Sequence, residues 1–261
     1  MKVKTTMLVA LLMIVSVVQA DEAEQWEWVV APYIWASDVE LDASISGGGG
    51  IGGKVEFRDL LDKIDVGFMG RFEGRRGRWG LYLDTIYADI SDSNSRPVGP
   101  GGPILGNLSS ASSLNMQLWE AGGLYQLSAP EAAVRIDVLA GLRYIDMDMA
   151  VKVTLPGPAM TELDISSDTS ETDLMLGGRA YGEFAQHWHW TMRGDYSFGG
   201  TEGVYNGAVA VGRTIGETGR FSVDFGYRYM RIDMKGTNRL GERTESETEM
   251  SGPLLGFAFT F

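Results

Sequence analysis

The sequence contains no cysteine and only two histidines among its 261 residues. Without cysteine the chain can form no disulfide framework, no thiolate metal site and no lipid attachment through a thiol. Acidic residues outnumber basic ones by 35 to 22, for a formal net charge of −13. This balance argues against nucleic acid as a partner.

Long hydrophobic runs are also missing after the first 20 residues. Those 20 have the three parts of a secretory signal, with Lys2 and Lys4, an apolar stretch over 7–18, and the small residues Val18 and Ala20. We expect residues 1–20 to be a cleaved signal peptide and 21–261 to form one exported domain. The apolar stretch is short for an uncleaved anchor, and later segments are too short to cross a membrane as helices.

Apolar and polar side chains alternate along most of the remaining chain. Residues 66–72, 134–144, 190–198 and 221–229 each place apolar or aromatic residues on one face. In 221–229 the opposite face carries Asp224 and Arg228. An apolar face opposite a charged one is typical of membrane β-strands, with lipid outside and a polar lumen inside. A β-sandwich is the alternative, although its strands are usually shorter.

Turn-forming residues divide the chain into ten alternating segments. Short and long connections largely alternate between them, as in outer-membrane barrels with tight periplasmic turns and longer extracellular loops. The sequence therefore predicts an all-β protein with one closed, ten-stranded antiparallel barrel, in which the first strand pairs with the last. The predicted strands are 25–44, 64–75, 78–91, 112–127, 133–152, 172–186, 188–199, 204–214, 219–236 and 245–261.

The last segment carries an aromatic face. Leu255, Phe257, Phe259 and Phe261 alternate with small residues. Such a strand resembles the signal that the barrel-assembly machinery reads in outer-membrane proteins, so we expect these four residues to act in assembly. Phe261 is expected in a periplasmic aromatic girdle, and Tyr33 and Trp35, with other aromatics, are expected nearer the outer rim.

Several stretches are similar to a family of largely uncharacterised Gram-negative outer-membrane β-barrel proteins. They are "WEWVVAPYIWASDVE", "FRDLLDKIDVGFMGRFEGRRGRWGLYLDTIYADIS", "LAGLRYIDMDM" and "SGPLLGFAFTF". The resemblance spans nearly all of the chain after the signal segment. It implies a barrel fold and an outer-membrane location, and no established activity or catalytic residues.

Residues for catalysis are scarce. His187 and His189 fall in a turn that the topology assigns to the periplasmic end, whereas a barrel protease or lipase would need a histidine near the outer mouth. The two histidines could form part of a metal site, but no third ligand is evident. We therefore expect no catalytic residues, no metal site and no cofactor.

The face predicted to line the lumen is rich in ion-pairing groups, and all its bases are arginine. Arginine suits such an interior because its planar fork can bind two carboxylates. The residues form either a structural network or a polar pathway for a small solute, and the small barrel favours the network. The predicted lumen residues are Asp65, Arg71, Glu73, Asp84, Glu120, Arg135, Asp137, Arg143, Arg179, Glu183, Arg193, Asp195, Asp224 and Arg228.

The sequence favours a non-enzymatic barrel, structural or a narrow channel for small hydrophilic solutes. A surface recognition or adhesion barrel acting through extracellular loops is the alternative, and an enzyme comes last. We expect a monomer whose partners are the assembly machinery, membrane lipid and lipopolysaccharide, the last near Arg231, Lys235, Arg239 and Arg243. Residues 57–64 break the alternation and predict a short helix in the first long loop.

Overall fold

The structure is a computed structural model that describes residues 25–45, 50–55, 64–97, 107–155, 161–216, 218–237 and 243–261. The predicted signal peptide lies outside the described residues. So does the predicted helix, except for Ile64, which begins a strand. Within the described part of the chain, no helix has the length and apolar character needed to cross a membrane.

The described chain forms twelve antiparallel strands, most of which join their sequence neighbours. Long stretches of period-two alternation account for their length, because each strand can turn one face to lipid and the other inward. The strands are β1 (Glu27–Trp35), β2 (Asp38–Ile45), β3 (Gly50–Val55), β4 (Ile64–Arg76), β5 (Trp79–Pro97), β6 (Asn107–Gln126), β7 (Val134–Leu155), β8 (Thr161–Ala185), β9 (Trp188–Gly199), β10 (Gly203–Ile215), β11 (Phe221–Thr237) and β12 (Arg243–Thr260).

A closed ten-stranded barrel accounts for all but one of these strands. The C-terminal half of β12 pairs with β1, and its N-terminal half pairs with β2. β1 and β2 together take the place of the first predicted strand, with an interruption at Ala36 and Ser37. A Cβ atom on Gly252 would lie 1.9 Å from the Ala36 carbonyl oxygen, so this interruption requires glycine on β12. The predicted strand number and the closure between the first and last strands are confirmed.

Two features of the outer end differ from the prediction. β3 pairs with β2 as an extra strand inside the predicted first long loop. β5 to β8 also extend further than predicted, and β5 still pairs with β6 at Pro97 and Asn107. These outer strand ends are rich in serine, threonine and acidic residues, and their apolar residues, such as Val153 and Leu163, are few. The alternation there is therefore too short to mark the strands.

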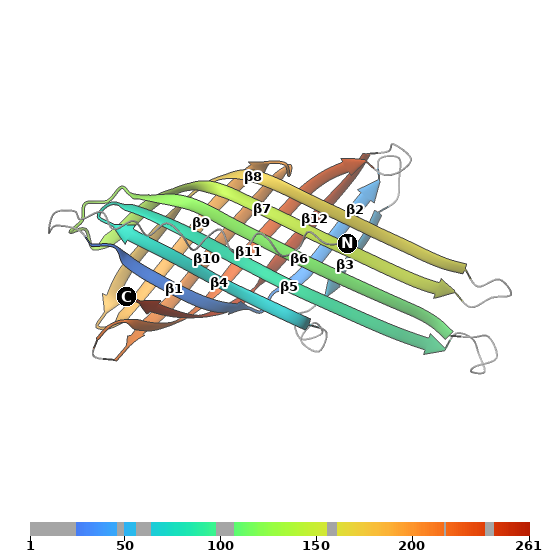
Figure 1. Ribbon diagram of the computed structural model, residues 1–261, viewed down its shortest axis with the longest axis horizontal. Coiled ribbons are helices and arrows are strands. Elements are labelled where there is room, and N and C mark those ends of the chain that lie inside the picture. The colour runs from blue at the N-terminus through green and yellow to red at the C-terminus, as the bar shows by residue number, and fades with distance from the viewer. Residues whose placement is uncertain are drawn as a thin grey trace, which may run out of the picture.

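The two ends of the barrel differ in shape (Figure 1). The C-terminal end of the chain lies beside the tight turns, whereas β5, β6, β7 and β8 project furthest at the opposite end. The tight turns use left-handed backbone at Gly77 and His187, with φ of 57° and 65°. Large apolar side chains such as Phe225 and Leu142 are exposed on the outer wall, where lipid can cover them.

Candidate functional site in the barrel lumen

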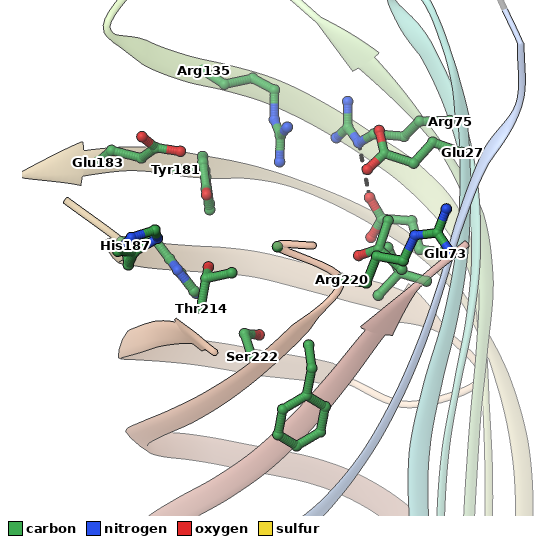
Figure 2. Close-up of a pocket in the computed structure, with 15 residues that line it drawn as sticks. Glu27, Glu73, Arg75, Arg135, Tyr181, Glu183, His187, Thr214, Arg220 and Ser222 are labelled. Carbon is green, nitrogen blue, oxygen red and sulfur yellow. Dashed lines mark hydrogen bonds and ion pairs between the residues drawn. The ribbon is translucent and has the colours of Figure 1, made fainter. Parts of the chain in front are cut away.

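The lumen is filled by side chains arranged in successive levels from the periplasmic end outward. The first level is a vestibule bounded by the ends of β1, β4 and β7 to β12, and Figure 2 shows its residues projecting into one space. Predicted lumen residues Arg135 and Glu183 lie here, together with Tyr181 and His189. The vestibule opens toward the tight-turn end.

The second level is an arginine cluster around two carboxylates. Glu73 accepts hydrogen bonds from Arg71 at 2.9 Å, from Arg75 at 2.9 Å and from Arg179 at 2.7 Å. Asp137 is paired with Arg75 and with Arg179, the latter at 3.1 Å. Three guanidinium groups therefore share two buried carboxylates and link β4, β7 and β8 across the lumen.

The third level contains the most deeply buried ion pairs. Arg143 and Glu120 have no exposed side-chain surface, and Arg143 Nη2 donates to Glu120 Oε1 at 2.8 Å. Arg193 Nη2 approaches Glu120 Oε2 at 2.6 Å, and its Nε donates to Asp195 Oδ2 at 2.7 Å. Asn206 Nδ2 donates to the same Asp195 oxygen at 2.7 Å. The level is closely cross-linked, and charge-assisted bonds of this kind are the stronger ones.

Arg228 and the first strand complete this level. Arg228 Nε donates to Asn206 Oδ1 at 2.9 Å, and its Nη1 lies 3.1 Å from the Tyr33 hydroxyl oxygen. The Tyr33 hydroxyl donates to Asp84 at 2.8 Å, while the Arg228 guanidinium lies 5.0 Å from the centre of the Trp35 ring. The prediction that Tyr33 and Trp35 belong to an outer girdle is wrong, because both side chains lie inside the barrel.

An apolar level lies inside the lumen next to the third level, on its extracellular side. Ile86, Ile145 and Met230 each follow a charged lumen residue by two positions, so they share its face one step further from the periplasm. Trp35 packs into the same cluster and is only 2% exposed. The sequence analysis did not predict an apolar layer inside the lumen. Its buried members are Trp35, Ile86, Met116, Leu118, Ile145, Val204, Met230, Ile232 and Met250.

Asp224 and Arg228 share the inward face of β11, but they lie at different levels of the lumen. Asp224 belongs to the vestibule, where its Oδ1 lies 2.7 Å from His189 Nε2 and its Oδ2 accepts from Ser222 at 2.9 Å. The two residues do not pair, because four residues along a strand span about 13 Å. Asp65 lies in β4, and its side chain is outside the described part.

Other residues of the network were missed by the sequence reading. Arg75 continues the inward face of Arg71 and Glu73 up to the turn. Ser197 follows Asp195 by two positions, and its hydroxyl donates to Asp173 at 3.0 Å. Strict continuation of the alternation would have found all three, whereas the exact partners depend on the stagger between strands.

His189, Asp224 and Ser222 do not have the order of a catalytic triad. In such a triad the histidine lies between the nucleophile and the carboxylate. Here Asp224 lies between Ser222 and His189, so the serine hydroxyl donates to the carboxylate and not to the histidine. Among the described residues, no group of three or more His, Cys, Asp or Glu side chains is placed to hold a metal ion.

The residues predicted to act in assembly lie on the outer wall at the end of the barrel. Leu255, Phe257, Phe259 and Phe261 are all exposed there, and Phe261 exchanges backbone hydrogen bonds with Trp28. Their role in assembly stays a prediction.

Comparison with known proteins identifies the fold. No protein-family model matches the sequence, and no curated protein matches it. The outer membrane protease OmpT from Escherichia coli is similar in structure, with a TM-score of 0.51, 10% identity and coverage of 90% of this chain and 97% of that one. At such an identity the likeness shows the fold alone.

Two further solved structures match with lower scores. The translocator domain of the autotransporter NalP from Neisseria meningitidis has 13% identity, a TM-score of 0.41 and coverage of 91% of this chain and 89% of that one. Neisserial surface protein A has 16% identity, a TM-score of 0.30 and coverage of 92% and 100%. All three are Gram-negative outer-membrane barrels, and they differ in role.

Proposed function

Because the chain is a closed β-barrel of the Gram-negative outer-membrane type, we propose that it is a non-enzymatic, structural barrel whose lumen is closed by its own side chains. The observation that carries this proposal is the stacking of two buried levels. Arg143 and Glu120 are fully buried in one, and Ile86 and Leu118 are fully buried in the next. A continuous water path would leave such side chains partly exposed.

The apolar level also argues against a narrow channel for hydrophilic solutes. An ion or small polar molecule that passed the arginine levels would next meet Trp35, Met230 and Met250, which offer it no charged partner. Hydrophobic constrictions of this kind exclude water and thereby block ions. The charged and apolar levels together account for closure better than the charged network alone.

A surface recognition function is the second candidate, and the strand lengths favour it. β8 has 25 residues, which corresponds to roughly 80 Å of extended chain, whereas a tilted strand crosses a membrane with about 9–11 residues. The strands β5 to β8 therefore carry a wall of sheet beyond the membrane (Figure 1). A closed barrel that supports such a wall is suited to presenting an extracellular surface.

The proposal is tested by recording current through planar lipid bilayers. Purified wild-type protein should insert and show no steady conductance. A double variant, Trp35→Ala with Met230→Ala, removes two large members of the apolar level and should raise the frequency of open events. Steady, ohmic conductance from the wild type would contradict the proposal and favour the narrow channel.

The bilayer experiment needs a control for insertion. The double variant Trp119→Ala with Met192→Ala removes the same residue types from the outer wall, where both side chains are exposed. It should be as silent as the wild type. Equal current from the inner and outer variants would show that the apolar level does not close the lumen.

A further inference from the structure

The vestibule has the size of a small-molecule site. Its volume is about 580 Å³, within the range of pockets that hold small ligands. If the lumen is closed as proposed above, on which this inference rests, a solute that enters from the periplasmic end meets a dead end. The described lining comes from strands that lie far apart in sequence, including Arg135 on β7 and Thr214 on β10.

Positive charge is in excess where the vestibule meets the arginine cluster. Arg71, Arg75, Arg135 and Arg179 lie around only two carboxylates, Glu73 and Asp137. Arg71 is also close to Asp84, at 3.6 Å. The other three share the two carboxylates, so at least one cation is not matched by a carboxylate of its own.

Of these four arginines, Arg135 has the longest contact with its nearest carboxylate. Its Nε is buried and has no hydrogen-bond partner among the described residues, and its distance to Asp137 Oδ2 is 3.6 Å, too long for a hydrogen bond. Its guanidinium lies 4.7 Å from the centre of the Tyr181 ring, which also stacks on His189 at 5.5 Å. The ring holds the guanidinium in place, and Figure 2 shows it pointing into the open space.

Two carboxylates at the mouth of the vestibule could compete for Arg135, namely Glu27 and Glu183. Both residues are exposed, so water screens their charge more strongly than that of a buried group. No hydrogen bond or ion pair joins either of them to Arg135 among the described residues. The Arg135 side chain as a whole is 33% exposed and lines the vestibule, so part of its guanidinium reaches a cavity large enough for an acceptor to enter.

We propose that the vestibule binds a small oxyanion, a carboxylate or phosphate group carried by a periplasmic solute, with Arg135 as the principal donor. The planar guanidinium fork matches either group, because two parallel N–H groups can donate to two oxygens. Thr214 lines the same space and offers a hydroxyl donor to the rest of the ligand.

The test is calorimetric titration of the purified protein in a non-ionic detergent and a low-chloride buffer. Inorganic phosphate and succinate are the probes, and succinamide is the uncharged control. The wild type should bind at least one of the two anions and should not bind succinamide. The anion with the lower Kd shows whether the site prefers a phosphate or a carboxylate group.

Two variants distinguish binding at Arg135 from nonspecific attraction of anions to positive charge at this end of the barrel. Arg135→Gln should weaken binding by about tenfold or more, the usual loss when a hydrogen bond to a charged group is removed. Arg213→Gln makes the same charge change at the same end of the barrel, but Arg213 lies outside, 5.7 Å from the Trp188 ring centre. It should alter affinity by less than about twofold, as expected for a screened, distant charge.

A second variant covers the case in which Arg135→Gln fails to fold. Thr214→Trp keeps all charges and fills part of the vestibule, so it should also abolish binding. The proposal is overturned if neither anion binds the wild type at millimolar concentration. It is also overturned if Arg213→Gln weakens binding as much as Arg135→Gln, or if folded Thr214→Trp binds normally.

Discussion

Replacement of Arg143 by alanine tests the third level of the lumen most directly. Arg143 Nε and Nη2 donate to Glu120 at 3.1 and 2.8 Å, and Nη1 donates to the Ser197 hydroxyl at 3.0 Å. Arg143 is also ion-paired with Asp195. Since none of its side chain is exposed, water cannot replace these bonds without entering the barrel.

The structure sets the size of the expected effect. Removal of one partner from a buried ion pair lowers the free energy of unfolding by about 3–5 kcal/mol. Glu120 and Asp195 both keep Arg193 as a partner, at 2.6 and 2.7 Å, so neither carboxylate is left unpaired. We therefore expect Arg143→Ala to lower the free energy of unfolding by about 3 kcal/mol, the lower end of that range.

The assay is denaturant-induced unfolding in lipid vesicles, followed by tryptophan fluorescence and extrapolated linearly to water. Arg231→Ala is the matched control, because Arg231 pairs with Asp233 and Glu247 on the outer wall and is 37% exposed. Its loss should cost no more than about 1 kcal/mol. If Arg143→Ala is destabilised by no more than this control, the buried level does not hold the barrel together and the reasoning is refuted.

Two further predictions concern packing and the side of the wall on which a residue lies. Gly141→Ala should destabilise the barrel by about 1–3 kcal/mol, because the new Cβ would lie 2.3 Å from the Ala121 carbonyl oxygen. Gly194→Ala should be tolerated, since nothing lies within 4 Å of the position of its new Cβ. Equal urea midpoints for the two variants would contradict this prediction. Among single-tryptophan variants, one that keeps Trp119 should be quenched strongly by brominated lipid, whereas one that keeps Trp35 should not, and strong quenching of Trp35 would place it outside.

The sequence predicted the barrel because its evidence is local. A strand exposed to lipid on one face must alternate, and residues 221–229 show the pattern without reference to any other part of the chain. The order of the strands followed from short connections and from the need to close every edge. Even the inward position of Arg143 and Glu120 followed from the alternation.

The same alternation could not separate a lumen-facing tryptophan from one in a girdle. Trp35 and Ile34 are both apolar, so the end of β1 gives no contrast between its two faces. The neighbouring break at Ala36 and Ser37 further obscures the phase. Only the pairing of Trp35 with Leu254 on β12 places its ring inside, against Arg228.

The partners inside the lumen were decided by tertiary structure alone. Because barrel strands are tilted and staggered, residues at one level come from sequence positions that no local pattern relates. This stagger brings Asp224 to His189 and leaves Arg228 with Tyr33 and Asn206. It also gathers single apolar residues from many strands into one closed layer. The alternation indicated which charged side chains face inward, and the stagger decided which of them meet.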